Sequence, residues 1–430
     1  FVTGRKYGFF PGASIGWRIS EESFIKDIPV ISNLKVRGGY GKVGNPLNAG
    51  RFAYLATINT GITYPFGGSP VVLSGAAPTR GQNTDLSWEN NYQANIGVDL
   101  GLFQNRIEVT VDVYDRRSPN LLANVPPSYV SGTYESVPTN AISAYNRGLD
   151  LAINTRNLVS ATGVNWTTSL TFSTFKNRIS DLNVAQPFNG VTTRTGTPIV
   201  RYDAGQPFGA FYGYVADGLF QTPEEVSKAP KQTVGATTGT STAPGDIRFK
   251  DLNGDGQITD KDRTFIGSPI PAFTYGINNT VSWKGFDLNM FIQGSQGNDV
   301  YNLNRVYTEG GLYSNGNSST RVLGRWTGPG TSNDVPRAVA GDPNLNLRVS
   351  SYFIEDGSYL RIKLLTLGYN FPKTLLNRFA GQTLRVYVSS QNLLTLTKYT
   401  GFDPELGSAG IDRGIYPQSR VFLAGVNIGF

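Results

Sequence analysis

The chain has 430 residues, of which 38 are Lys or Arg and 31 are Asp or Glu, so its formal net charge is +7. It contains no Cys and no His, which excludes disulfides, thiol nucleophiles, Cys/His zinc sites and triads that need an imidazole base. Only 16% of the residues are charged and the basic ones are scattered, so the clustered charge of a nucleic-acid-binding surface is missing. No stretch reaches the ~18 consecutive apolar residues of a membrane-spanning helix.

Alternation of apolar and polar residues predicts β-strands along the whole chain. The first covers residues 13–20, and the clearest runs from Trp88 to Phe103. Further runs begin at Ile107, Phe273 and Phe286, and the last covers 419–430. We expect about eleven strands. Because the chain opens at Phe1 inside such a pattern, without an initiator Met, we interpret it as a piece of a longer polypeptide.

The polar faces of these strands indicate a hydrated lumen rather than an open surface. They are rich in Asn, Gln, Thr, Ser and Gly and poor in Lys and Glu. The strands are also longer than the five or six residues usual in globular sheets. Strands of ~9 to 11 residues, apolar outside and polar inside, are typical of transmembrane barrels.

The predicted connections alternate between short and long. Tight turns are expected at 103–106 and 283–286, and medium ones at 21–32, 157–164 and 372–382. Long connections are expected at 44–86, 118–140, 179–270, 298–352 and 395–417. Trp17, Trp166 and Trp283 fall near the short-turn ends, as in an interfacial aromatic girdle. The sequence therefore predicts an all-β, transmembrane antiparallel β-barrel with short turns on one side and long loops on the other.

Several segments resemble SusC/RagA-like TonB-dependent transporters of Bacteroidetes outer membranes. They span nearly the whole chain in family order: Lys6–Ser20 (KYGFFPGASIGWRIS), Leu34–Gly41 (LKVRGGYG), Gly209–Tyr214 (GAFYGY), Asp217–Gln221 (DGLFQ), Gly245–Gly256 (GDIRFKDLNGDG), Ser358–Lys363 (SYLRIK) and Gly368–Phe371 (GYNF). The final strand, which ends on Phe430, resembles the signal that barrel-assembly machinery recognises.

The resemblance implies that residues 1–430 are the C-terminal part of a 22-stranded outer-membrane barrel. The plug, the TonB box and the N-terminal strands would then lie outside these residues. It also implies import of glycan or peptide fragments, a SusD-like surface lipoprotein as partner, TonB as energy source, outer-membrane lipid around the barrel, and no catalysis. Nucleic acid is not an expected partner.

One motif predicts a metal site. Residues 251–262, within the long loop 179–270 expected on the extracellular side, follow the spacing of a calcium loop. The expected Ca²⁺ ligands are Asp251, Asn253, Asp255, Gln257 and Asp262, with Gly256 at the sharp turn and Ile258 anchoring the loop. The alternative is an Asx-rich turn without metal, since Asn, Asp and Gly are ordinary turn formers. The expected role of calcium is structural.

Other polar groups leave more than one interpretation open. Asp403, Glu405 and Asp412 suggest glycosidase carboxylates, but a solvated loop is the preferred interpretation. Six cations alternate toward the inferred lumen and either line a hydrated pathway or pair with Asp99 and Asp112: Arg18, Lys35, Arg37, Arg361, Lys363 and Arg385. Loop aromatics could stack on sugars, with ordinary packing as the default: Phe208, Phe211, Tyr212, Tyr214, Tyr301, Tyr307 and Tyr313. Leu364 and Leu365 break the alternation after Lys363, which predicts a bulge.

Two other functions compete with transport. A calcium-stabilised surface β protein, acting as an adhesin or carbohydrate-binding module, would explain the strands and the acidic loop. It would need polar outer strand faces, whereas positions such as Val98, Val109 and Leu288 are apolar. A hydrolase is the weakest alternative, because no convincing set of catalytic residues is visible.

Overall fold

The computed structural model describes residues 1–2, 4–65, 72–160, 163–184, 186–193, 196–232, 242–313, 316–373 and 383–429. Phe430 and most of the connection expected at 372–382 lie outside these residues. The chain forms two compact units. Unit 1 comprises Phe1–Thr155, Ser173–Phe188 and Tyr202–Phe208, and unit 2 comprises Arg156–Phe172, Asn189–Arg201 and Gly209–Phe430.

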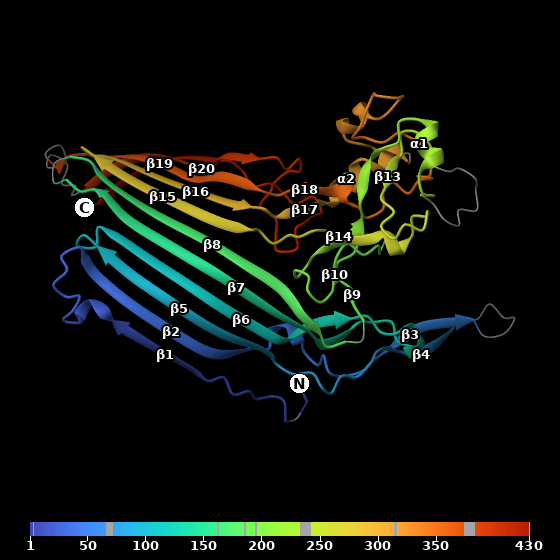
Figure 1. Ribbon diagram of the computed structural model, residues 1–430, viewed down its shortest axis with the longest axis horizontal. Helices are drawn as coiled ribbons and strands as arrows, with labels where there is room; N and C mark the ends of the chain where they lie inside the picture. Colours follow the sequence, from blue (N-terminus) through green and yellow to red (C-terminus); the bar gives the residue numbers. More distant parts are fainter. Residues whose placement is uncertain are drawn as a thin grey trace. The chain divides into compact units, whose positions relative to one another are not determined.

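Eleven strands form one large sheet (Figure 1). In the order of their hydrogen-bonded neighbours they are β1 (Gly12–Arg18), β2 (Ile31–Asn45), β5 (Glu89–Leu102), β6 (Ile107–Val125), β7 (Val137–Leu158), β8 (Asn165–Leu182), β15 (Phe273–Trp283), β16 (Phe286–Gln296), β19 (Tyr359–Asn370), β20 (Thr383–Thr397) and β22 (Val421–Gly429). The ladders from β1 to β7 and from β15 to β22 are antiparallel. The predicted all-β class and the eleven predicted strands are confirmed.

The connections between these strands carry smaller elements. The short strands are β3 (Thr57–Pro65), β4 (Val72–Arg80), β9 (Phe188–Asn189), β10 (Arg201–Tyr202), β11 (Phe211–Tyr214), β12 (Ala216–Leu219), β13 (Ile247–Phe249), β14 (Arg263–Gly267), β17 (Asp299–Asn302), β18 (Ile354–Asp356) and β21 (Ile411–Asp412). Among the described residues, the α-helices are α1 (Pro223–Lys228) and α2 (Leu303–Thr308). Single 3₁₀ turns lie at Ile19–Glu21, Leu47–Ala49, Tyr129–Ser131, Asp260–Asp262, Gly310–Leu312, Thr320–Gly324 and Ser351–Phe353. Within the described part of the chain, no helix is both long and apolar enough to cross a membrane.

The two faces of the large sheet differ in polarity, as the alternation predicts. In unit 1, Ile96 of β5 lies opposite Val113 of β6, and their exposed fractions are 66% and 54%. The other face carries Arg37, which forms ion pairs with Asp99 at 3.2 Å and with Asp112 at 2.5 Å. One face is therefore apolar and uncovered, while the other is polar and internally paired.

The tight turns are found where the sequence places them. β15 ends at Trp283 and β16 begins at Phe286, with Lys284 and Gly285 between them at φ 47° and 91°. Positive φ at both central residues is the mark of a type I′ hairpin turn, which matches the right-handed twist of the flanking strands. The turn at 103–106 joins β5 to β6 through four residues, the first three of which have positive φ.

One predicted connection is wrong in its bounds. The loop expected at 118–140 is mostly strand, because β6 and β7 stay paired up to Val125↔Val137 and only 126–136 connect them. Pro119 lies within the register shift between Ser118 and Leu121, where a bulge accommodates a residue that cannot donate to the ladder. Apolar residues of β6 pack there against a core of Ala141, Ile142, Ala144, Ile179 and Phe188. The prolines in this segment favoured the prediction of a loop, although the strands continue through it.

Candidate functional site

A β-bulge decides which side chains of β19 reach the polar face of the sheet. β19 pairs with β16 continuously except between Ile362 and Leu364, where Lys363 is an extra residue. If Lys363 were instead paired as an ordinary strand residue, the two-residue period would carry Arg361 to the apolar face, because a one-residue slip reverses every side chain. The bulge predicted after Lys363 is confirmed, and its effect is to place Arg361 on the polar face.

Arg361 is the centre of a buried charge cluster between β19 and the last long loop. The residue is 3% exposed, and its guanidinium donates to Asp403 at 2.7 Å and to Glu405 at 2.6 Å. Lys363 donates to the same Glu405 at 2.8 Å, and the Arg361 Nε donates to Thr395 Oγ1 of β20 at 2.8 Å. Charge-assisted hydrogen bonds are stronger than neutral ones, so the cluster fixes residues 403–405 to the sheet.

Asp403 is buried although it lies in irregular structure. In addition to Arg361, it accepts the backbone N–H groups of Gln418 and Glu405, each at 2.9 Å. Burial by itself would raise the pKa of Asp403, but the hydrogen bonds from the two backbone groups and from Arg361 outweigh it and hold the pKa below its ordinary value. The ionised carboxylate is therefore the stable form of this group.

The expectation of a solvated carboxylate loop is wrong for Asp403 and Asp412. Asp412 is fully buried on β21, which runs parallel to β17. Its carboxylate accepts the Tyr399 hydroxyl at 2.5 Å, and burial together with this contact raises the pKa of Tyr399. The sequence could not show this, because the two partners meet only when the loop folds back on itself. Both carboxylates hold the loop in place.

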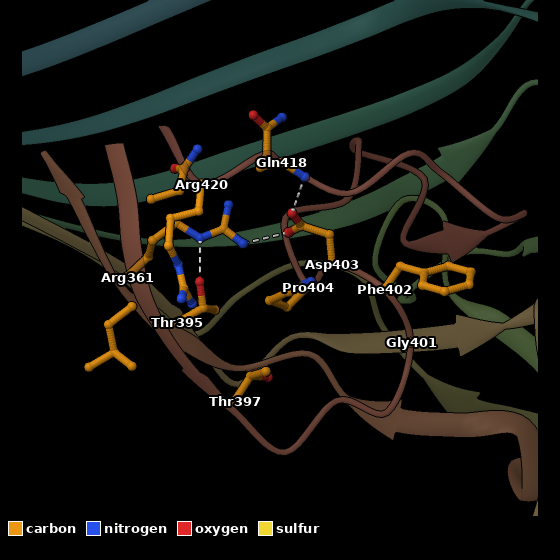
Figure 2. Close-up of a pocket in the computed structure, with 11 residues that line it drawn as sticks. Arg361, Thr395, Thr397, Gly401, Phe402, Asp403, Pro404, Gln418 and Arg420 are labelled. Carbon is orange, nitrogen blue, oxygen red and sulfur yellow. Dashed lines mark hydrogen bonds and ion pairs between the residues drawn. The ribbon is translucent and has the colours of Figure 1, made fainter. Parts of the chain in front are cut away.

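A polar pocket of about 330 Å³ lies beside the charge cluster (Figure 2). Figure 2 shows Arg361 bonded to Thr395 and Asp403, with Gln418 bonded to Asp403 from the other side. β19, β20 and the last loop supply the lining: Arg361, Asn392, Leu394, Thr395, Thr397, Gly401, Phe402, Asp403, Pro404, Gln418 and Arg420. Sequence reasoning missed Phe402 and Gln418, which lie in irregular loop without periodicity. It also missed Arg420, which fell inside the predicted strand 419–430 but precedes the observed start of β22 at Val421.

The acidic segment 251–262 folds as a compact turn. The Asp251 carboxylate accepts the N–H of Gly254 at 2.7 Å and that of Gly256 at 2.8 Å. Both glycines have positive φ, at 75° and 77°, a conformation that other residues rarely adopt. Ile258 is buried among Leu219, Ile247 and Phe249, as its expected anchoring role requires.

The five predicted calcium ligands are only partly brought together. Asp262 is fully buried, accepts backbone N–H groups of Thr259 at 2.7 Å and Leu252 at 2.9 Å, and interacts with the side chain of Asp251. Burial would raise the pKa of Asp262, but these hydrogen bonds lower it overall. Two further ligands bond to each other instead, since the Asn253 amide donates to Asp255 at 2.9 Å.

Gln257, the remaining predicted ligand, bridges to Lys231 through its backbone. In the described parts of the chain, no three Asp, Glu, His or Cys side chains are grouped closely enough to hold a metal ion. The first and last acidic positions of the loop nevertheless lie together, and their oxygens are the kind that Ca²⁺ prefers. The calcium site stays a prediction.

The cations of the polar face are mostly paired. Arg37 binds Asp99 and Asp112, and Arg385 of β20 binds Asp287 of β16 at 2.5 Å. Gly97 and Gly368 lie under these pairs, where an added Cβ would come within 2.7 Å of the paired side chains. Of the two interpretations left open by the sequence, pairing is the one observed for Arg37.

The loop aromatics divide into buried and exposed groups. Phe211 and Tyr301 have no exposed surface and face each other with ring centroids 6.1 Å apart, and Tyr313 is buried in a separate cluster. These three follow the default of ordinary packing. Phe208 and Tyr307 are partly exposed.

Comparisons with known proteins agree with one another. A family model described as "TonB dependent receptor-like, beta-barrel" matches residues 2–283. The chain is 34% identical to TonB-dependent receptor P3 of Formosa agariphila and 29% identical to TonB-dependent receptor SusC of Bacteroides thetaiotaomicron. All of the chain is covered in both cases, with 42% and 41% of those proteins. The solved structure of the RagAB peptide transporter superposes with a TM-score of 0.77 at 26% identity, covering 98% of this chain and 43% of that one.

A sheet with an uncovered apolar face and an ion-paired polar face defines the class of membrane-spanning β-barrel proteins. Within that class, the chain belongs to the TonB-dependent receptor β-barrel family and is SusC/RagA-like. It is a protein of the bacterial outer membrane, and its family consists of receptors and transporters rather than enzymes. The chain spans less than half the length of the curated relatives that it matches.

Proposed function

We propose that this chain is the barrel portion of a TonB-dependent importer that carries glycan or peptide fragments across the outer membrane. The observation that carries the proposal is the two-faced sheet, with an apolar face toward lipid and a polar face toward a hydrated passage. Similarity to SusC and to the RagAB peptide transporter over nearly the whole chain supports it. Transport, cargo and partners are inferred for the whole protein.

In this proposal the turns, the loops and the partner proteins have different roles in transport. The short turns face the periplasm and the long connections face outward. Folded loops, fixed by clusters such as that of Arg361, surround the mouth and contact the cargo. A SusD-like lipoprotein caps this mouth, and TonB supplies the energy. No bond of the cargo is made or broken by this protein.

The test begins with the full-length protein in its native outer membrane. Detergent extraction, affinity purification and mass spectrometry should recover a SusD-like lipoprotein with it. Cells should take up labelled glycan or peptide fragments only when both the full-length protein and TonB are present. A protein that stays soluble without detergent, binds no lipoprotein and supports no uptake would instead favour the surface-adhesin alternative.

We also propose that the turn 251–262 binds Ca²⁺ as a structural ion. The observation that favours it is the geometry of the two ends of the turn: Asp262 accepts the N–H of Leu252, the residue next to Asp251, at 2.9 Å, and carboxylate oxygens are ligands that Ca²⁺ prefers. The turn is joined to Lys231, since the Ile258 N–H donates to the Lys231 carbonyl at 2.8 Å. An ion here would therefore stiffen both segments.

Calcium binding to the full-length protein can be measured by calorimetry, with hydrogen exchange of residues 251–262 as a second readout. We expect Ca²⁺ to slow exchange in the turn, and the double variant Asp251→Asn/Asp262→Asn to abolish that effect. Glu224→Gln, on the exposed face of α1, is the matched control and should respond as the unaltered protein does. Equal exchange with Ca²⁺ and with a chelator would refute the ion.

A further inference from the structure

The pocket beside Arg361 has one positive charge that nothing nearby compensates. Arg361 and Lys363 are matched by Asp403 and Glu405, because three ion pairs of 2.6–2.8 Å join these four groups. Arg420 lines the same pocket and is exposed. Among the residues that the structure describes, it forms no hydrogen bond or ion pair.

The rest of the lining is suited to one end of a flexible ligand. Phe402 is 70% exposed and offers an uncovered aromatic ring. Arg361 and Thr395 lie on the polar face of the strands, so the pocket adjoins the polar side of the sheet. A guanidinium presents a planar fork of N–H donors that matches a carboxylate in a bidentate manner.

We propose that this pocket binds the free C-terminal carboxylate of a peptide cargo, with Arg420 as the charged partner and Phe402 in contact with the terminal side chain. The proposal rests on the proposed importer function and narrows its cargo class. A peptide end combines one carboxylate with one apolar side chain, as the pocket combines one free cation with one apolar wall. A neutral oligosaccharide leaves the charge of Arg420 without a partner.

Arg361 has a positioning role in this arrangement. Its own charge is neutralised, but it holds Asp403, and Asp403 in turn accepts the backbone N–H of Gln418 at 2.9 Å. Gln418 is two residues before Arg420. The buried ion pair of Arg361 and Asp403 therefore positions the backbone next to Arg420. The exposed Arg420 side chain binds the ligand.

The test uses the full-length protein, purified with its co-purifying lipoprotein, and a defined set of octapeptides ending in Phe, Leu or Ala. Each peptide is supplied as the free acid and as the C-terminal amide. We expect the acids to bind about tenfold more tightly than the amides, as for one charge-assisted contact. Arg420→Gln should reduce this ratio to about one. Arg413→Gln removes an exposed arginine of the same loop that lies outside the pocket lining, and should leave the ratio unchanged.

Each other result has a distinct meaning. Equal binding of acids and amides, no peptide binding, or equal effects of Arg420→Gln and Arg413→Gln would overturn the proposal. If only an oligogalacturonate bound, and Arg420→Gln abolished that binding, the carboxylate that the pocket recognises would belong to an acidic sugar. That result would overturn the peptide assignment. Arg420-dependent peptide binding without TonB-dependent uptake would leave the pocket in place and refute the importer function instead.

Discussion

Arg361 shows how one residue stabilises a loop that has little regular structure. It bonds to two carboxylates of the last long loop and to Thr395 of the neighbouring strand. A buried ion pair repays its desolvation only where the geometry is good and the remaining donors are satisfied. Four contacts among charged and polar groups meet that condition here, so the loop is fixed at its middle rather than only at its ends.

The lowered pKa of Asp403 predicts how this fixation depends on pH. Because the folded-state pKa lies below the ordinary value of 3.8, the stabilisation is fully present above that value and is lost as pH falls through the lower, folded-state value. Hydrogen exchange of residues 399–420, corrected for the intrinsic rate, should stay slow from neutral pH to about pH 5 and accelerate in stronger acid. Asp403→Asn should exchange faster already at neutral pH. Equal protection of the unaltered protein and of Asp403→Asn at neutral pH would contradict the assignment.

Single residues were predictable where they disturb a regular pattern. The bulge at Lys363 follows from two consecutive leucines in an alternating strand, and the turn at Lys284–Gly285 follows from the end of one alternation and the start of the next. The pairing of Arg361 with Asp403 was not predictable, because 42 residues separate them and neither the loop path nor its burial leaves a periodic signal.

At the scale of elements, alternation predicted the strands well and their ends poorly. β15 runs from Phe273 to Trp283 as predicted, since both its ends are marked by turn residues. β6 and β7 extend well beyond their predicted ends. There the apolar residues pack against a loop core instead of lipid, so the rule that places polar residues inside and apolar ones outside no longer applies.

The β15–β16 turn predicts a local stability effect. Gly285 has φ 91°, and a Cβ at this position would lie 2.8 Å from the Asn370 carbonyl oxygen. Gly285→Ala should therefore lower the free energy of unfolding by about 1–3 kcal/mol, measured by urea titration of the full-length protein in lipid vesicles. Gly324→Ala is the matched control, because no atom lies within 4 Å of its added Cβ. A loss no larger than that of the control would show that the turn relaxes without cost.

At the scale of the whole molecule, the two faces of the sheet predict which residues meet lipid. The absence of cysteine from the sequence allows single cysteines to be placed cleanly on either face. Ile96 and Val388 are uncovered apolar residues, one in each unit, whereas their neighbours Asn95 and Ser389 lie on the opposite face by the two-residue period.

Fluorophores attached at Ile96→Cys and Val388→Cys should be quenched strongly by spin-labelled lipid in vesicles of the full-length protein. Fluorophores at Asn95→Cys and Ser389→Cys should be quenched several-fold less. We expect this difference because successive side chains of a strand in a barrel wall face lipid and the interior in turn. Similar quenching on both faces would mean that the sheet does not separate lipid from a polar interior.

The bulge has a consequence for how such a wall can change in evolution. Ile362 pairs with Leu394 and Leu364 with Gln391, so β20 also carries an extra residue at this level, where Asn392 has φ 52°. Below these residues, the alternation of side chains is constrained by contact with lipid. Above them, it is constrained by contact with the loops. If Lys363 were paired as an ordinary strand residue instead, Arg361 and the segment above it would turn to the opposite face. A two-residue insertion above the bulge would keep each side chain on its present face. The upper ends of the strands can therefore lengthen or shorten by two residues at a time without changing which residues face lipid below the bulge.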